Sequence, residues 1–187
     1  MVEMLGVLAI IGVLSVGGIA GYSKAMTKFK INKSMDQVTT LVTKIRTMYG
    51  QQKSYEGLDI EQSVSMGIIP SDMVENSTSL TNAFAGTVLL GNVKFNNHDA
   101  GAFQLVYNGL GQEACVTMAT SDWGSGSSSG LLGISISGSS QAIIESAPVA
   151  TQNGSFTGTD LPVKIIDAVS FCECEASNNC SIAWYYQ

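Results

Sequence analysis

Charged residues are scarce in this chain of 187 residues, of which they make up only 13%. An ordinary soluble domain carries roughly 25% charged residues. Hydrophobic residues account for 45% of the chain. The shortage of charge indicates that part of the chain is apolar on all sides, or that neighbouring molecules cover much of its surface. The length allows one compact domain with a core and an appendage, but not two large domains.

Basic residues are scarcer still beyond position 53. Residues 1–53 hold seven Lys or Arg and two acidic residues, a net charge of +5, whereas residues 54–187 hold two basic and thirteen acidic residues, a net charge of −11. This asymmetry favours attraction between the basic part of one copy and the acidic part of another, and it equally fits separate tuning of two solvated surfaces. The acidic second part argues against nucleic-acid binding through a broad basic patch.

Residues typical of catalytic and metal sites are also few. The single histidine, His98, lies beside Asp99 in a polar segment without a nucleophile motif, so we interpret the two as a surface turn pair. The four cysteines have no Cys-x-x-Cys spacing. We therefore expect no catalytic residue, no metal site and no cofactor, and we interpret the cysteines as disulfide partners in an oxidising compartment. These cysteines are Cys115, Cys172, Cys174 and Cys180.

A long hydrophobic run lies at the beginning of the sequence. The segment from Met4 to Tyr22 contains no charged residue, and as a helix it would reach about 28 Å, close to the ~30 Å hydrocarbon core of a bilayer. It differs from a signal peptide because no basic residue precedes it and no clean cleavage site follows it. We expect this helix to lie in lipid, in a bundle of identical helices, or in each by turns.

Residues 23–49 continue the helix with an amphipathic pattern. Charged residues, among them Lys28, Lys44 and Arg46, fall outside an apolar stripe whose members recur every three or four positions. The stripe consists of Ile31, Met35, Val38, Val42, Ile45 and Tyr49, with Leu41 and Met48 widening it. We predict one helix of about 48 residues that Gly50 ends. Its residues 1–22 form a membrane or filament-core half, and its residues 23–50 form an amphipathic half that packs on a globular head of residues 51–187.

Glu3 is the one charged residue near the apolar end of this helix. A carboxylate near hydrocarbon is costly unless it is paired. Glu3 therefore either favours the dipole at the start of the helix or pairs with a positive group of another subunit.

The segment from Val2 to Leu14, a glutamate followed by an apolar stretch that contains glycine, resembles the N-terminal signature of type IV pilins and pseudopilins. Residues 112–120 resemble the cysteine-bearing helix of bundle-forming, type IVb pilins. The resemblance implies that a prepilin peptidase removes a short basic leader, that the new N-terminus is methylated, and that Glu3 neutralises the N-terminal amine of a neighbouring subunit. Because this glutamate lies slightly further from the cut in most members, we expect the chain to begin about two residues inside the mature protein.

The resemblance also implies that the apolar helices form the core of a filament. The residues expected in that core are Leu5, Val7, Leu8, Ile10, Ile11, Val13 and Leu14. Many pilins carry a proline about twenty residues into this helix, where this chain has Gly17, Gly18 and Gly21 instead, with Gly12 before them. Each glycine costs roughly 1 kcal/mol relative to alanine in a helix. We predict that the helix can loosen between Gly12 and Gly21; the alternative is that these small residues only allow close helix packing.

The remaining sequence predicts an α+β head in which an antiparallel-type sheet packs on the second half of the long helix. The expected strands are Thr87–Leu90, Ala102–Val106, Leu131–Ser137 and Ser181–Tyr186, with a polar turn at Asn96–Gly101 and with Gln141–Ile144 extending or pairing with the third strand. The expected short helices are Asp59–Met66, Gly111–Thr120 and Leu161–Phe171, and Gly124–Gly130 is expected to be a flexible loop.

Four cysteines allow three pairings. We favour Cys115–Cys172 with Cys174–Cys180, because the position of Cys172 fits the end of the family's C-terminal disulfide loop. The main alternative is Cys115–Cys174 with Cys172–Cys180, since a strand would place Cys172 and Cys174 on the same face.

These patterns and the resemblance predict the major structural subunit of a type IV pilus, not an enzyme. The expected partners are further copies of the chain in a helical filament, the inner membrane before assembly, the pilus assembly machinery and the prepilin peptidase. The resemblance implies adhesion, aggregation, motility or DNA uptake as downstream roles on an extracellular pilus. The alternatives are a minor pilin or pseudopilin of a type II secretion system, and a membrane-anchored periplasmic binding protein or enzyme.

Overall fold

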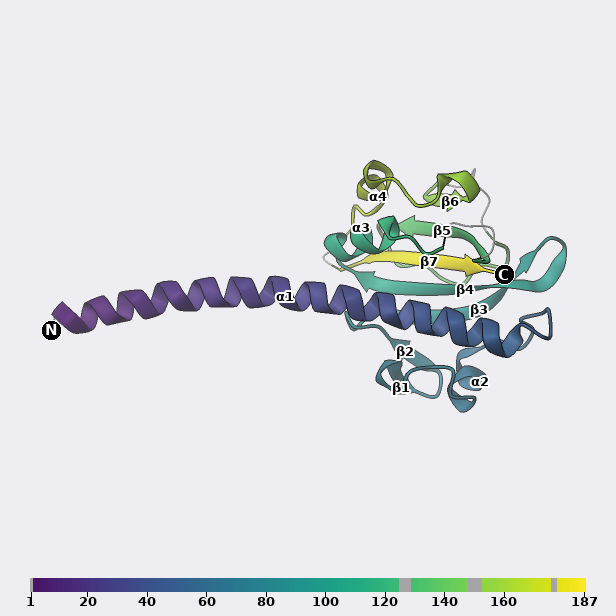
Figure 1. Ribbon diagram of the computed structural model, residues 1–187, viewed down its shortest axis with the longest axis horizontal. Coiled ribbons are helices and arrows are strands. Elements are labelled where there is room, and N and C mark those ends of the chain that lie inside the picture. Colours follow the sequence, from purple (N-terminus) through teal and green to yellow (C-terminus); the bar gives the residue numbers. More distant parts are fainter. Residues whose placement is uncertain (1, 125–128, 148–152, 176–177) are drawn as a thin grey trace.

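A computed structural model describes residues 2–124, 129–147, 153–175 and 178–187. The helix α1 (Val2–Tyr49) is unbroken over 48 residues. Its first half projects away from the rest of the molecule, and its second half lies along the head (Figure 1). The expected single helix that ends at Gly50 is therefore confirmed.

The head is built on an antiparallel sheet. Within the described residues the sheet has seven strands in the order β1-β2-β3-β4-β7-β5-β6. The strands are β1 (Val74–Asn76), β2 (Ser79–Thr81), β3 (Thr87–Phe95), β4 (His98–Leu110), β5 (Leu131–Ser137), β6 (Ser155–Thr157) and β7 (Cys180–Tyr186). All four expected strands are present, and the last strand of the chain lies near the middle of the sheet, between β4 and β5.

Two of the expected strands are longer than the sequence indicated, because the turn between them is shorter. Asn96 and Asn97 both have a left-handed backbone, with φ of 50° and 62°, which asparagine adopts more easily than most residues. Residues from His98 onward already pair with β3. The prediction that the turn spans Asn96–Gly101 is therefore wrong, because only Asn96 and Asn97 separate the two strands.

The main core lies between the sheet and the second half of α1. Val38, Leu41 and Ile45 are fully buried there against large side chains of the sheet, including Phe103 and Trp184. Met48, which we expected to widen the apolar stripe, is instead half exposed. It lies beside Met66 and Ile68 at the edge of the helix and not over the sheet.

A smaller core covers the opposite face of the sheet. Val93, Val106 and Tyr185 are buried there, and Ala147 packs against them. Residues 138–147 pass over this face, and Ile143 lies next to Gly91, where a Cβ atom would come within 3.3 Å of its Cγ2. The absence of a side chain at Gly91 therefore lets this segment approach the sheet.

The prediction that Gln141–Ile144 forms or pairs with a strand is wrong. The backbone N–H of Gln141 donates to Asn108 Oδ1 at 2.8 Å, and the Gln141 carbonyl accepts from Asn108 Nδ2 at 3.0 Å. A side chain thus satisfies backbone groups that a strand would have used. The backbone of Lys94 bonds Glu145 and Ala147 further along.

Short helices and turns complete the head: α2 (Ile60–Ser65), α3 (Gln112–Thr120), α4 (Ile165–Phe171) and the 3₁₀ turns Ser71–Met73 and Gly158–Asp160. Asp59 caps α2 as expected, its Oδ1 accepting from the Gln62 N–H at 2.7 Å. The helix expected from Leu161 begins only at Ile165, because a residue before proline avoids the helical conformation and Leu161 is extended.

Candidate assembly surface

The first half of α1 carries large apolar side chains that the head does not cover. Val13 is 76% exposed, and Met4, Leu8 and Ile19 are 66–76% exposed. By length and composition, the described part of α1 from Gly6 onward is apolar enough to cross a membrane, and the head buries none of its most apolar stretch. Isolated apolar surface on this scale normally marks an interaction site.

The structure places most of the expected filament-core residues on this surface. Their exposed fractions range from 53% to 76%, and the residues are Val7, Leu8, Ile10, Ile11 and Val13. The backbones of Glu3, Leu5 and Leu14 belong to α1, but their side chains lie outside what the structure describes, so their expected roles stay predictions.

The expected weak point of the helix also stays a prediction. The backbone of α1 is helical throughout the segment that contains Gly12, Gly17, Gly18 and Gly21. A Cβ atom built at Gly12, Gly18 or Gly21 would meet nothing within 4 Å. Within a single molecule these glycines are therefore not required for packing, and any steric reason for them lies in contact with other molecules.

The apolar surface continues past the hydrophobic run to Phe29, which is 60% exposed. The sequence analysis did not identify Phe29 as a surface residue. Its position outside the apolar stripe that begins at Ile31 could have indicated that it does not face the head. Lys24 and Lys28 are exposed on the same stretch, after Tyr22. Aromatic and basic side chains at the end of an apolar helix are typical of a membrane interface.

Three polar contacts fix α1 where it enters the head. Lys33 Nζ lies 2.9 Å from Asp72 Oδ2, and Gln37 Nε2 donates to the same oxygen at 3.0 Å. The hydrogen bond from Lys33 lowers the pKa of Asp72, and Gln37 adds to this effect. Lys30 Nζ lies 5.9 Å from the centre of the Phe84 ring, within reach of a cation–π interaction. These contacts could not be predicted from a sequence motif, because Asp72 and Phe84 lie in irregular segments far along the chain from α1.

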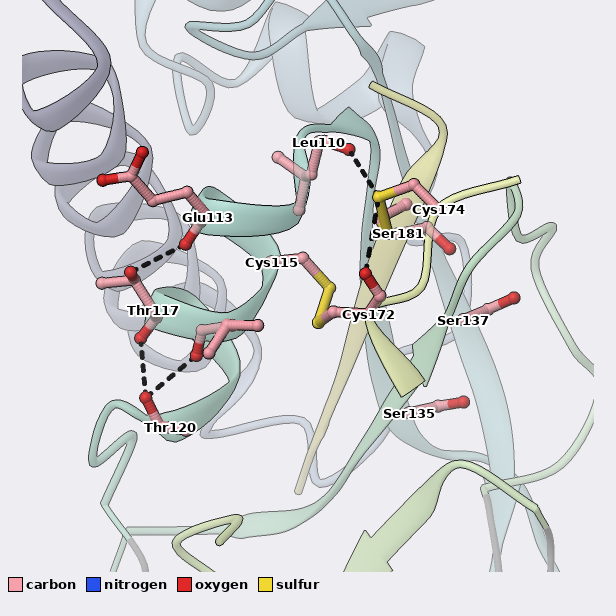
Figure 2. Close-up of a disulfide and its surroundings, with 12 residues drawn as sticks. Leu110, Glu113, Cys115, Thr117, Thr120, Ser135, Ser137, Cys172, Cys174 and Ser181 are labelled. Carbon is pink, nitrogen blue, oxygen red and sulfur yellow. Dashed lines mark hydrogen bonds between the residues drawn. A yellow bond between two sulfur atoms is a disulfide. The ribbon is translucent and has the colours of Figure 1, made fainter. Parts of the chain in front are cut away.

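Two disulfides join α3, the segment after α4 and the start of β7 in the head. Cys115 on α3 is joined to Cys172 at the end of α4, and Cys174 is joined to Cys180 at the start of β7, each with an S–S distance of 2.04 Å. Of the pairings that the sequence left open, the structure thus contains Cys115–Cys172 with Cys174–Cys180. Figure 2 shows the first bond between α3 and Cys172, the residue that follows α4, with Cys174 near the carbonyl of Leu110.

Groups that could support catalysis are not brought together. His98 is exposed, and Asp99 pairs with Lys94 at 3.2 Å instead. Among the described residues there is no cluster of three or more His, Cys, Asp or Glu side chains suited to a metal ion. The candidate site is the exposed apolar surface of α1, which is suited to association.

A long N-terminal helix, half of it exposed and apolar, combined with an antiparallel sheet that packs on the other half, defines the type IV pilin class. Two solved structures share this fold. A type IV pilin from Vibrio cholerae El Tor biotype has a TM-score of 0.59 at 17% identity, covering 84% of this chain and 99% of that one. A type IVb pilin from Salmonella typhi has a TM-score of 0.53 at 19% identity, covering 81% and 98%.

Sequence comparison identifies the family within the type IV pilin class. The family model described as Bundlin matches residues 23–187, and this chain belongs to the bundlin family. The major structural subunit of the bundle-forming pilus of Escherichia coli O127:H6 (strain E2348/69 / EPEC) is 28% identical over 139 residues, 74% of this chain and 70% of the relative. The corresponding subunit of Escherichia coli O111:H- is 28% identical over 125 residues, 66% of this chain and 64% of the relative.

Proposed function

We propose that this chain is the major structural subunit of a type IV pilus and that the exposed first half of α1 polymerises it. The observation that carries this proposal is the uncovered apolar surface of α1, of which Val13 is 76% exposed. Burial of one such Val, Leu or Ile side chain contributes roughly 1.5–3 kcal/mol. Several of them on one helix therefore supply a strong drive toward a bundle of sister helices. Relatives that are named as major subunits of a pilus support the same function.

The same surface suits a membrane before assembly. In this proposal the apolar half lies in the bacterial inner membrane after a prepilin peptidase has removed a leader. The assembly machinery then transfers the subunit into an extracellular filament. The glycines from Gly12 to Gly21 would let the helix adjust when it leaves lipid for the shorter spacing of a filament, since each weakens the helix by roughly 1 kcal/mol.

Glu3 is proposed to set the register of this assembly. A carboxylate in an apolar core is penalised unless a positive group pairs with it. The N-terminal amine of a neighbouring subunit is a suitable partner because every copy supplies both groups. The resulting contact is head-to-tail and does not close, which generates a filament. Adhesion, aggregation, motility or DNA uptake are the downstream roles that a pilus of this class would support.

Electron microscopy of the cell surface tests the proposal directly. We expect long fibres that contain this chain, and we expect Glu3→Ala to abolish or greatly reduce them while the variant accumulates in the membrane with a folded head. Glu61→Ala is the matched control, because Glu61 is an exposed glutamate on α2, and its fibres should be normal.

Two results would contradict the proposal. Short periplasmic structures without surface fibres would favour a pseudopilin of a secretion system. A protein that stays a monomer in its native host would favour a membrane-anchored periplasmic binding protein. Normal fibres from Glu3→Ala would remove only the role given to Glu3.

A further inference from the structure

The two ends of the head carry groups of opposite charge. α1 and β7 run in the same direction, so that one end of the head faces the projecting half of α1 and the other holds the C-terminus (Figure 1). We call these ends the base and the tip. Cys180 begins β7 at the base, and Gln187 follows β7 at the tip. A strand of this length separates the two ends by about 20 Å.

An acidic loop lies at the base. Glu173 and Glu175 flank Cys174, and both glutamates are exposed. The disulfide from Cys174 to Cys180 ties this loop to β7, and the Glu175 N–H donates to the Gly138 carbonyl at 2.9 Å. The backbone that carries the two carboxylates is therefore held from two directions. Neither carboxylate belongs to the ion pairs of the described chain, which are Lys33–Asp72 and Lys94–Asp99.

A basic cleft lies at the tip. It has a volume of about 610 Å³ and is formed by the last turns of α1 together with Lys53, Tyr55, Gly101 and Gln187. Arg46 and Lys53 are its charged lining residues, and no acidic side chain lines it. The Arg46 guanidinium is held in place by donating to the Ser129 carbonyl. Burial raises the pKa of Tyr55, and Arg46 opposes that rise, so a positive charge lies beside the phenol ring.

We infer that the acidic loop at the base of one head docks on the basic cleft at the tip of another copy along the filament. This inference rests on the proposed function, because a filament with parallel α1 helices turns the base of each head toward the tips of others. The contact joins two different surfaces and does not close on itself, as a filament requires. Charge complementarity of this kind fixes register and excludes wrong partners.

The acidic loop that docks on the cleft belongs to a second copy and not to the same molecule. Glu173 and Glu175 lie at the far end of β7 from the cleft, a separation of about 20 Å that a side chain does not span. Arg46 and Lys53 provide a guanidinium and an ammonium in the same cleft, and the two glutamates lie on either side of the disulfide-bonded Cys174. The side-chain charges of the two surfaces are therefore opposite in sign.

Zero-length crosslinking of purified wild-type fibres with a carbodiimide tests the contact without any substitution. The reagent joins an amine directly to a carboxylate, and we expect Lys53 to be linked to Glu173 or Glu175. The same link should be missing from detergent-solubilised monomers, because one molecule cannot form it. Fibres in which Lys53 links only to other acidic residues, or to none, would overturn the inference. A preparation without fibres would instead count against the proposed function.

Charge reversal gives an independent test in intact cells. Lys53→Glu should lower the amount of pilin in the sheared fibre fraction by about tenfold, as expected for a repelled charge at an interface, while the head keeps its unfolding midpoint. A second reversal, Glu175→Lys or Glu173→Lys, should restore fibres in the Lys53→Glu background. Glu61→Lys serves as the matched control and should not restore them. Rescue by neither loop variant, or equal rescue by Glu61→Lys, would refute the docking.

Discussion

The two halves of α1 have the same backbone and opposite environments. Val13 and Val38 are the same residue type in one continuous helix, yet Val13 is 76% exposed and Val38 is fully buried. The second half contributes to a fold that one molecule completes by itself. The first half offers an apolar surface that a single molecule cannot bury. The comparison teaches that apolar character alone does not distinguish a core residue from an assembly residue; what matters is whether the chain supplies the facing surface.

The largest expected effect is a loss of head stability that occurs when the buried half of α1 is changed and not when the exposed half is. Val38→Asp places an unpaired carboxylate in the main core and should destabilise the head by more than about 4 kcal/mol. Urea denaturation of the detergent-solubilised protein, followed by circular dichroism, should then show no cooperative transition. Val13→Asp is the matched control, and its head should unfold at the wild-type urea concentration while its fibres disappear. Equal loss of stability in both variants would break the distinction between the halves.

Both disulfides lie in the head, so removing them should affect the part that folds within one molecule and not the exposed half of α1. Replacing Cys115 and Cys172 by alanine opens a loop with a sequence separation of 57 residues, whereas Cys174 and Cys180 are separated by 6. The chain-entropy model then gives losses of about 4 and about 2 kcal/mol in the free energy of unfolding. Urea denaturation measures both losses, and membrane retention should be unchanged. A larger loss for the small loop would contradict this account.

A smaller effect is expected from the buried amide of Gln104. Its side chain is fully buried in β4, and neither its Nε2 nor its Oε1 has a hydrogen-bond partner among the residues that the structure describes. Unpaired buried polar groups cost about 1–3 kcal/mol, so Gln104→Leu should raise the free energy of unfolding by about 1–2 kcal/mol. Asn108→Leu is the control, because it removes the two bonds to Gln141 and should destabilise. A loss of stability in Gln104→Leu would show that the amide has an unseen partner.

The smallest expected effect concerns the junction between the halves. The bond from Lys33 lowers the pKa of Asp72, so this carboxylate stabilises the folded state above the unfolded pKa of about 3.9. Its contribution is lost as pH falls through the lower folded value. Both side chains are substantially exposed, at 38% and 43%, which limits the contribution to about 0.2–1 kcal/mol.

Thermal unfolding of the wild type and of Asp72→Asn over a range of pH tests this contribution. The gap between their melting temperatures should be present at pH 7 and should close under strongly acidic conditions. A gap that stays constant with pH would show that the effect does not come from the charge of Asp72.

Periodicity predicted those parts of the molecule in which one face of an element is buried. Five of the six residues of the stripe from Ile31 to Tyr49 are buried, which follows from a core on one side of the helix. Ile166 lies in the expected helix Leu161–Phe171, yet its apolar side chain is 77% exposed on α4. A helical period shows that residues share a face, but it does not show what lies opposite that face.

The rest of the fold depended on pairings that no local pattern reveals. β1, β2 and β6 contain three residues each, which is too short for an alternating pattern to stand out. The segment at Gln141 is fixed by the side chain of Asn108, 33 positions earlier. The cleft at the tip likewise combines the end of α1 with Gly101 and Gln187. Candidate residues on α1 could therefore be predicted from the sequence, whereas the surfaces of the head required the structure.

Electron cryomicroscopy of the native fibre tests the central claim most directly. We predict that the α1 helices of many copies run together along the fibre axis, that Val13 lies against neighbouring helices, and that the heads form the outer surface. A fibre whose axis is lined by heads, with the first half of α1 outside the bundle or in solvent, would contradict the account.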